Sequence, residues 1–137
     1  MELFQKSPAK FLLLPRIILG TVFLSEGIQK FVTPVEIGPG RFAKIGFSHP
    51  EFWAYFTGSF EIICGVLILA GILIRFAVIP LLIIMIVAFV ATKMPILEHK
   101  GFWAFAHEYR TDFAMTLLII LLLKYTFRKN PIGPQAF

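Results

Sequence analysis

The sequence predicts an all-α integral membrane protein, a four-helix bundle that forms a single domain over residues 1–129. Hydrophobic residues make up 58% of the 137 residues and charged residues 15%, whereas a soluble domain has about 25% charged residues. Phe alone occurs 16 times, which suits lipid-facing helices better than a small core. Four long apolar segments follow one another along the chain. A soluble fold of this length could not hide so much apolar surface.

The four apolar segments predict the four membrane helices, because each has about the length that crosses a bilayer. These helices are expected at about residues 11–31, 52–74, 76–92 and 112–127. The last segment is short, so its span recruits flanking residues, and the Lys124 ammonium reaches towards the headgroups. Residues 130–137 contain two prolines and are expected to form a flexible C-terminal tail.

The connections between these segments differ in kind. Almost nothing but Arg75 separates the second and third segments, which predicts a tight antiparallel hairpin. The first connection, residues 33–51, is rich in Pro and Gly, and residues 41–45 within it are expected to form a short interfacial helix. The connection before the last helix, residues 93–112, is aromatic and charged, which predicts an aromatic loop at the membrane surface.

Basic residues indicate how the helices are oriented. The net charge is +5, and Lys and Arg lie mainly at the ends of apolar segments, a pattern typical of membrane anchoring and not of nucleic-acid binding. Lys6 and Lys10 precede the first segment, but no small-residue cleavage motif follows, so we expect a retained helix and not a cleaved signal. The tightest basic clusters are at the termini, which favours a cytoplasmic location for both.

Charged residues inside apolar segments are the candidate functional groups, because each costs at least about 2.5–3.5 kcal/mol near the bilayer centre. This polar intramembrane cluster comprises Arg16, Glu26, Lys30, Glu61, Arg75, Lys93 and Asp112. Glu61 lies near the middle of its segment, and its expected partner is Arg16, about 10 Å away in depth. Three roles remain open for Glu61: a structural ion pair, a site for protons or a polar headgroup such as a quinone ring, and exposure to a water-filled cleft.

Depth along the helices brings several of these residues to one side of the membrane. Glu26, Lys30, Lys93 and Asp112 are expected to line a polar pocket with Glu61 that opens on the side of the longer loops. Four glycines, Gly20 and Gly27 on the first helix and Gly58 and Gly65 on the second, share faces with these charges. Small residues at such positions allow close helix packing, so the charged faces are expected to point towards protein and not towards lipid.

No motif in the chain indicates a particular reaction. There is no Gly-rich phosphate loop, nucleophile elbow or haem attachment motif, and no catalytic residue is assigned. Cys64 is the only cysteine, which excludes a thiol oxidase that works through its own cysteine pair. His99, His107 and Arg110 are polar candidates in the connection before the last helix, but the two histidines lack ligand spacing, so no metal site is expected.

The order and spacing of three segments resemble the DoxX family of small bacterial membrane proteins. The first helix reads RIILGTVFLSEGIQKF, the following loop contains RFAKIGFSHP, and the second helix reads GSFEIICGVLILAGILIR. The stretch KGFWAFAHEYRTDFAM resembles a subgroup of the same family. The positions that match the family pattern are Arg16, Gly20, Gly27, Lys30, Glu61, Gly65, Gly71, Arg75 and Asp112.

The resemblance implies a four-helix bundle in the bacterial cytoplasmic (inner) membrane. The family is named from a subunit linked to a terminal oxidase and to quinone-dependent thiosulfate oxidation. The resemblance therefore implies an accessory membrane subunit of a quinone-linked or oxidative-stress redox system. A quinone is then the candidate ligand, and no covalently bound cofactor is expected. The redox centres would lie on a membrane or peripheral protein partner, because the chain has no flavin, haem or iron–sulfur motif. The alternative functions are a non-catalytic scaffold or assembly partner and a small transporter. Association into a homo-oligomer also stays open.

Overall fold

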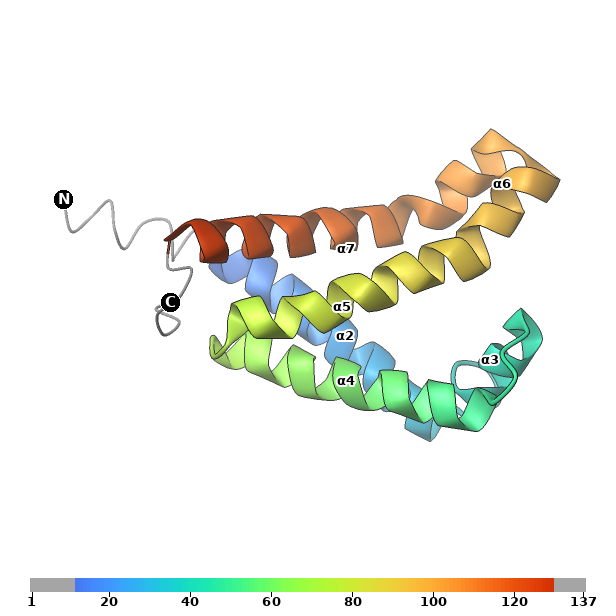
Figure 1. Cartoon of the computed structure of the whole chain (residues 1–137), viewed down its shortest axis with the longest axis horizontal. Helices are drawn as coiled ribbons and strands as arrows, with labels where there is room; N and C mark the ends of the chain where they lie inside the picture. Colours follow the sequence, from blue (N-terminus) through green and yellow to red (C-terminus); the bar gives the residue numbers. More distant parts are fainter. Residues whose placement is uncertain (1–11, 130–137) are drawn as a thin grey trace.

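Every regular element in residues 12–129, the part of the chain that the computed structural model describes, is a helix (Figure 1). The elements in chain order are α2 (Leu13–Val32), α3 (Pro39–Ile45), α4 (Pro50–Ala70), α5 (Ile74–Ala88), the π-helical turn η1 (Phe89–Lys93), α6 (Met94–Lys100) and α7 (Phe102–Lys129). The prediction of an all-α protein is confirmed. The tail expected at residues 130–137 lies outside the described residues.

Helices α2 and α4 pack antiparallel at very short range. A Cβ atom added to Gly27 would lie 2.7 Å from the Gly58 carbonyl oxygen, and one added to Gly65 would lie 2.9 Å from the Gly20 carbonyl oxygen. Both distances are shorter than any side chain tolerates, so the two backbones meet where neither residue carries a side chain. This geometry is the one that small residues permit between membrane helices.

A tight turn joins α4 to α5. Gly71 ends α4 in the left-handed conformation, with φ of +77°, and the Ile72 N–H donates to the Leu67 carbonyl oxygen. This arrangement satisfies carbonyls at the helix end and reverses the chain. Arg75, which the sequence placed in the connection, lies instead in the first turn of α5 and is 2% exposed.

The prediction of an aromatic loop before the last helix is wrong. Residues 94–100 form α6, and α7 begins at Phe102, so only Gly101, with φ of +90°, interrupts the helical structure. The aromatic residues follow helical spacing and contact one another. The ring centroids of Phe105 and Tyr109 are 5.4 Å apart, and those of Tyr109 and Phe113 are 5.9 Å apart. Stacking between rings four residues apart stabilises a helix. This contribution favours a helix over the predicted loop.

The helices lie closest together at one end of the molecule. Buried side chains from α2, α4, α5 and α7 form one apolar core, which includes Leu19, Ile68, Leu81 and Ile119. This core lies towards the α4–α5 turn. From there α5 and α7 diverge from α2 and α4 towards the end that carries α3 and α6 (Figure 1). The end at which the helices converge, called the closed end below, therefore holds the apolar core. At the other end the helices are farther apart, which leaves room for a cavity.

Two helical stretches have the length and the apolar composition needed to cross a membrane, Pro50–Ala70 and Ile74–Lys100. Many of their large apolar side chains are exposed, such as Phe52, Ile63 and Ile83, which are 56–58% exposed. Helices α2 and α7 are 20 and 28 residues long and carry several charged residues. A short helix, α3, is present where the interfacial helix was predicted, and its position at a membrane surface stays a prediction.

Candidate functional site

A buried ion pair joins α2 to α4. The Lys30 Nζ atom lies 2.7 Å from the Glu61 Oε1 atom, and the two residues are 7% and 4% exposed. Among the described atoms, Oε1 has no hydrogen-bond donor other than the Lys30 ammonium. The Glu61 carboxylate is thus balanced in charge but retains the capacity to accept a hydrogen bond.

The direction of side chains along a helix explains this pairing. Every Cα–Cβ bond in an α-helix tilts towards the helix N-terminus. Because α2 and α4 are antiparallel and Gly27 lies beside Gly58, the side chains of Lys30 and Glu61 lean towards each other across that contact. Because the two glycines have no side chains, there is space in which the side chains of Lys30 and Glu61 meet.

The predicted pairing of Glu61 with Arg16 is wrong for the same reason. Arg16 leans away from Glu61, towards the end of α4. Its Nε donates to the Ile68 carbonyl oxygen at 3.2 Å, and its Nη2 donates to the Leu69 carbonyl oxygen at 3.3 Å. The guanidinium covers Gly71, where an added Cβ would lie 2.5 Å from Nη2. Arg16 therefore caps the C-terminus of α4, where carbonyls lack helical partners and a cation is favourable.

A second ion pair joins η1 to α7. The Lys93 Nζ atom lies 3.6 Å from the Asp112 Oδ2 atom, and the two side chains are 11% and 31% exposed. Lys93 ends the π-helical turn, a feature that often occurs at functional sites. This contact is longer and more exposed than the pair on α2 and α4, so Lys93 and Asp112 hold each other less firmly.

The two ion pairs line one cavity of about 700 Å³ between α2, α4, α5 and α7, with residues of the α3 region at one side. Its ionisable lining residues are three acids and three bases, so their formal charges cancel: Glu26, Lys30, Arg41, Glu61, Lys93 and Asp112. Most of the other lining residues are apolar, including Phe23, Trp53, Phe56 and Met115. The cavity thus combines hydrogen-bond donors and acceptors with an apolar, aromatic wall.

The structure separates the sequence candidates into two groups. Glu26, Lys30, Glu61, Lys93 and Asp112 lie around the cavity, whereas Arg16 and Arg75 do not line it. Sequence reasoning missed Arg41, Trp53 and three threonines, Thr57, Thr92 and Thr111, as lining residues. Arg41 lies in the segment that was predicted to form a short helix, but nothing in its spacing connects it with Glu61.

The polar candidates before the last helix lie outside the cavity. His99, His107 and Arg110 are exposed on α6 and the first turns of α7, where Arg110 donates to the His107 carbonyl oxygen. Among residues 12–129, no group of three or more His, Cys, Asp or Glu side chains is placed to hold a metal ion. These residues therefore contribute polarity to the surface near the cavity and not to its lining.

Comparison with known proteins gives the family. The DoxX family pattern matches residues 11–94, which include all of α2, α3, α4, α5 and η1. An uncharacterized membrane protein of Mycobacterium tuberculosis is 49% identical over 114 residues, which cover 79% of this chain and 70% of that relative. No solved structure gives a significant match. The chain therefore belongs to the DoxX family of membrane proteins.

Proposed function

We propose that the chain is a multi-pass protein of the bacterial cytoplasmic membrane, in which α2, α4, the Ile74–Lys100 helix and α7 each cross the bilayer. The shortest of them, α2, has 20 residues, a length of about 30 Å that matches the hydrocarbon core. The exposed apolar side chains of the four segments would then face lipid. Both termini are proposed to lie in the cytoplasm, so the cavity end is directed to the opposite side.

We further propose that the cavity binds the polar head of a quinone. The observation that supports this function is the buried Lys30–Glu61 pair in the wall of an aromatic cavity, with a carboxylate oxygen that has no donor besides Lys30. Lys30 and Lys93 can donate hydrogen bonds to quinone carbonyls, and Glu61 can accept one from a quinol hydroxyl. Aromatic residues such as Trp53 and Phe56 suit a flat ring.

In this proposal the chain is an accessory membrane subunit of a quinone-linked or oxidative-stress redox system. A bound quinone would carry the redox chemistry at this site. The chain's own residues bind and orient the quinone head, and the apolar wall limits access of water to it. A membrane or peripheral partner protein would exchange electrons with the quinone, since no sequence motif here provides another redox centre.

The two tryptophans allow a direct test. Trp53 lines the cavity, whereas Trp103 is 82% exposed and lies outside it. A quinone quenches the fluorescence of a nearby indole. In the Trp103→Phe variant, which retains Trp53, 2-methyl-1,4-naphthoquinone is expected to quench saturably. In the matched Trp53→Phe variant, quenching is expected to rise only linearly with concentration, as for collisions in the membrane. Equal, non-saturable quenching in both variants would contradict the proposal.

The glycine contacts between α2 and α4 favour a second candidate, a non-catalytic scaffold. In that case the Lys30–Glu61 pair serves only to fix the register of two closely packed helices. A scaffold would still capture its partner protein after both charged residues are replaced together by Met. The quinone-binding function predicts instead that this double variant folds but loses saturable quenching of Trp53.

A further inference from the structure

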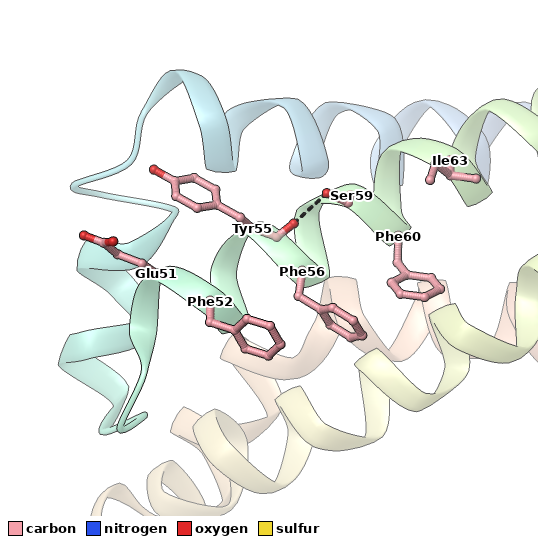
Figure 2. Close-up of a pocket in the computed structure, with 7 residues that line it drawn as sticks. All are labelled: Glu51, Phe52, Tyr55, Phe56, Ser59, Phe60 and Ile63. Atoms are coloured by element: carbon pink, nitrogen blue, oxygen red, sulfur yellow. Dashed lines mark hydrogen bonds between the residues drawn. The ribbon is translucent and has the colours of Figure 1, made fainter.

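A groove on the outer face of α4 meets the cavity at one residue. Figure 2 shows its seven lining residues: Glu51, Phe52, Tyr55, Phe56, Ser59, Phe60 and Ile63. Phe56 lines both this groove and the cavity that contains Glu61. The two hollows therefore share the side chain of Phe56 in their lining.

The groove is mostly apolar, and its one charged lining residue, Glu51, lies at the end nearest the start of α4. Phe52, Phe56 and Phe60 form a row on one side of α4 (Figure 2), with ring centroids 5.5 Å and 5.0 Å apart. The three residues are 57%, 47% and 37% exposed. The Ser59 hydroxyl donates to the Tyr55 carbonyl oxygen, so this polar group has its partner inside α4. Such a surface suits an alkyl or prenyl chain.

The opposite wall of the cavity also reaches the surface of the molecule. Ile83 and Val87 on α5 line the cavity and are 56% and 48% exposed. The gap between α4 and α5 is therefore bordered by Phe56 on one side and by aliphatic residues on the other. In the proposed membrane position, this border faces acyl chains and presents no charged group to them.

We propose that the cavity binds a long-tailed amphiphile that enters from the lipid phase between α4 and α5. The polar head lies against Lys30 and Glu61, and the tail passes Phe56 and lies along the groove of Phe52 and Phe60. This inference rests on the proposed function and adds to it the tail, the route and the place of the tail. The tail of the cavity's own ligand is the occupant that the geometry favours, because groove and cavity share Phe56.

Affinity measurements in nanodiscs test the contribution of the tail. Two probes share one head: 2-methyl-1,4-naphthoquinone, and the same ring with a decyl chain at position 3 that ends in a diazirine. Their concentrations are expressed per lipid, so that partitioning into the membrane does not count as binding. In the Trp103→Phe background, quenching of Trp53 by the tailed probe is expected to saturate at a concentration per lipid at least about tenfold lower than for the tail-less probe.

Photolabelling locates the tail. On irradiation, the diazirine is expected to label α4 peptides that contain Phe52 to Ile63, and excess tail-less naphthoquinone is expected to reduce this labelling. The double substitution Phe52→Ala and Phe60→Ala should lower the affinity for the tailed probe about threefold and leave the affinity for the tail-less probe unchanged. Phe76→Ala is the matched control, because Phe76 is as exposed as Phe52, at 57%, and lines neither hollow.

The outcomes separate the two proposals. Labelling that spreads over all lipid-facing helices and resists competition, while Trp53 is still quenched saturably by both probes, would overturn the tail route and leave the proposed function standing. Equal affinity per lipid for both probes would do the same. Absence of saturable Trp53 quenching by either probe would overturn the quinone-binding function and the tail route together.

Discussion

The two ion pairs around the cavity differ in how firmly the fold holds them. Lys30 and Glu61 meet at 2.7 Å across a glycine contact and are almost fully buried, whereas Lys93 and Asp112 are 3.6 Å apart and partly exposed. The first pair sits where the backbones of α2 and α4 are in close contact. The second sits where α5 and α7 diverge from them. A single cavity thus has one rigid wall, which would hold the head of the proposed ligand, and one looser, more adjustable wall.

Breaking the rigid pair should give the largest effect. Glu61→Ala leaves the Lys30 ammonium buried without its partner, which we expect to lower the free energy of unfolding by about 3–5 kcal/mol. Thermal unfolding in detergent can be followed with a thiol-reactive dye, because Cys64 is the only cysteine and is 4% exposed. Replacing Lys30 and Glu61 together by Met should restore most of the loss. A single variant as stable as the parent would show that the pair does not hold the wall.

Separating the two glycine-packed helices should cost somewhat less. In Gly27→Leu, the new side chain begins 2.7 Å from the Gly58 carbonyl oxygen, so α2 must move away from α4 at a cost of about 3 kcal/mol. The same dye assay measures the loss. The control is Ala114→Leu on the exposed face of α7, which should change stability by less than about 0.5 kcal/mol. Similar losses in both variants would contradict the special closeness of the α2–α4 contact.

Removing the cap at the closed end should have an intermediate effect. Arg16→Met leaves the Ile68 and Leu69 carbonyl oxygens without the guanidinium, which we expect to lower the free energy of unfolding by about 1–2 kcal/mol. Saturable quenching of Trp53 should remain, since Arg16 does not line the cavity. Loss of quenching in a folded Arg16→Met protein would mean that the closed end and the cavity are coupled.

The smallest effect on stability is expected at the looser pair. Lys93→Met should change the free energy of unfolding by less than about 1 kcal/mol, because partly exposed ion pairs contribute little. The same substitution should weaken quenching of Trp53 by naphthoquinone, because it removes a donor from the adjustable wall. Lys124→Met, at an exposed position of α7, should alter neither quantity. A Lys93→Met protein that unfolds as easily as Glu61→Ala would remove the distinction between the two walls.

Composition and segment lengths were enough to predict the all-α class and the membrane character, and the resemblance of several segments to the DoxX family predicted the family. They could not predict which charged groups meet. Depth along the helices suggested Arg16 as the partner of Glu61, but depth ignores the tilt of side chains towards the helix N-terminus. In an antiparallel pair this tilt turns Lys30 and Glu61 towards each other and turns Arg16 towards the α4 carbonyls.

The segment before the last helix shows a second limit of sequence reasoning. Its charges and aromatic residues predict a surface loop. The spacing of Phe105, Tyr109 and Phe113 is also that of stacked rings on one helix face, and this contribution prevails. The sequence predicted a polar pocket around Glu61 but not that Arg41 and Trp53 also line it, because their approach to the cavity depends on how the helices diverge.

The π-helical turn at Phe89–Lys93 has a consequence for how variation in chain length would act. A π turn contains one residue more than the α turn that it replaces, so the side chains that follow it are rotated by about 100° relative to an uninterrupted helix. Deletion of one residue between positions 89 and 92 would leave the composition nearly unchanged but swing the Lys93 ammonium out of its present direction. The direction of the Lys93 ammonium therefore depends on the one extra residue in the π turn. A substitution cannot produce this change, because it leaves the number of residues in the turn unchanged.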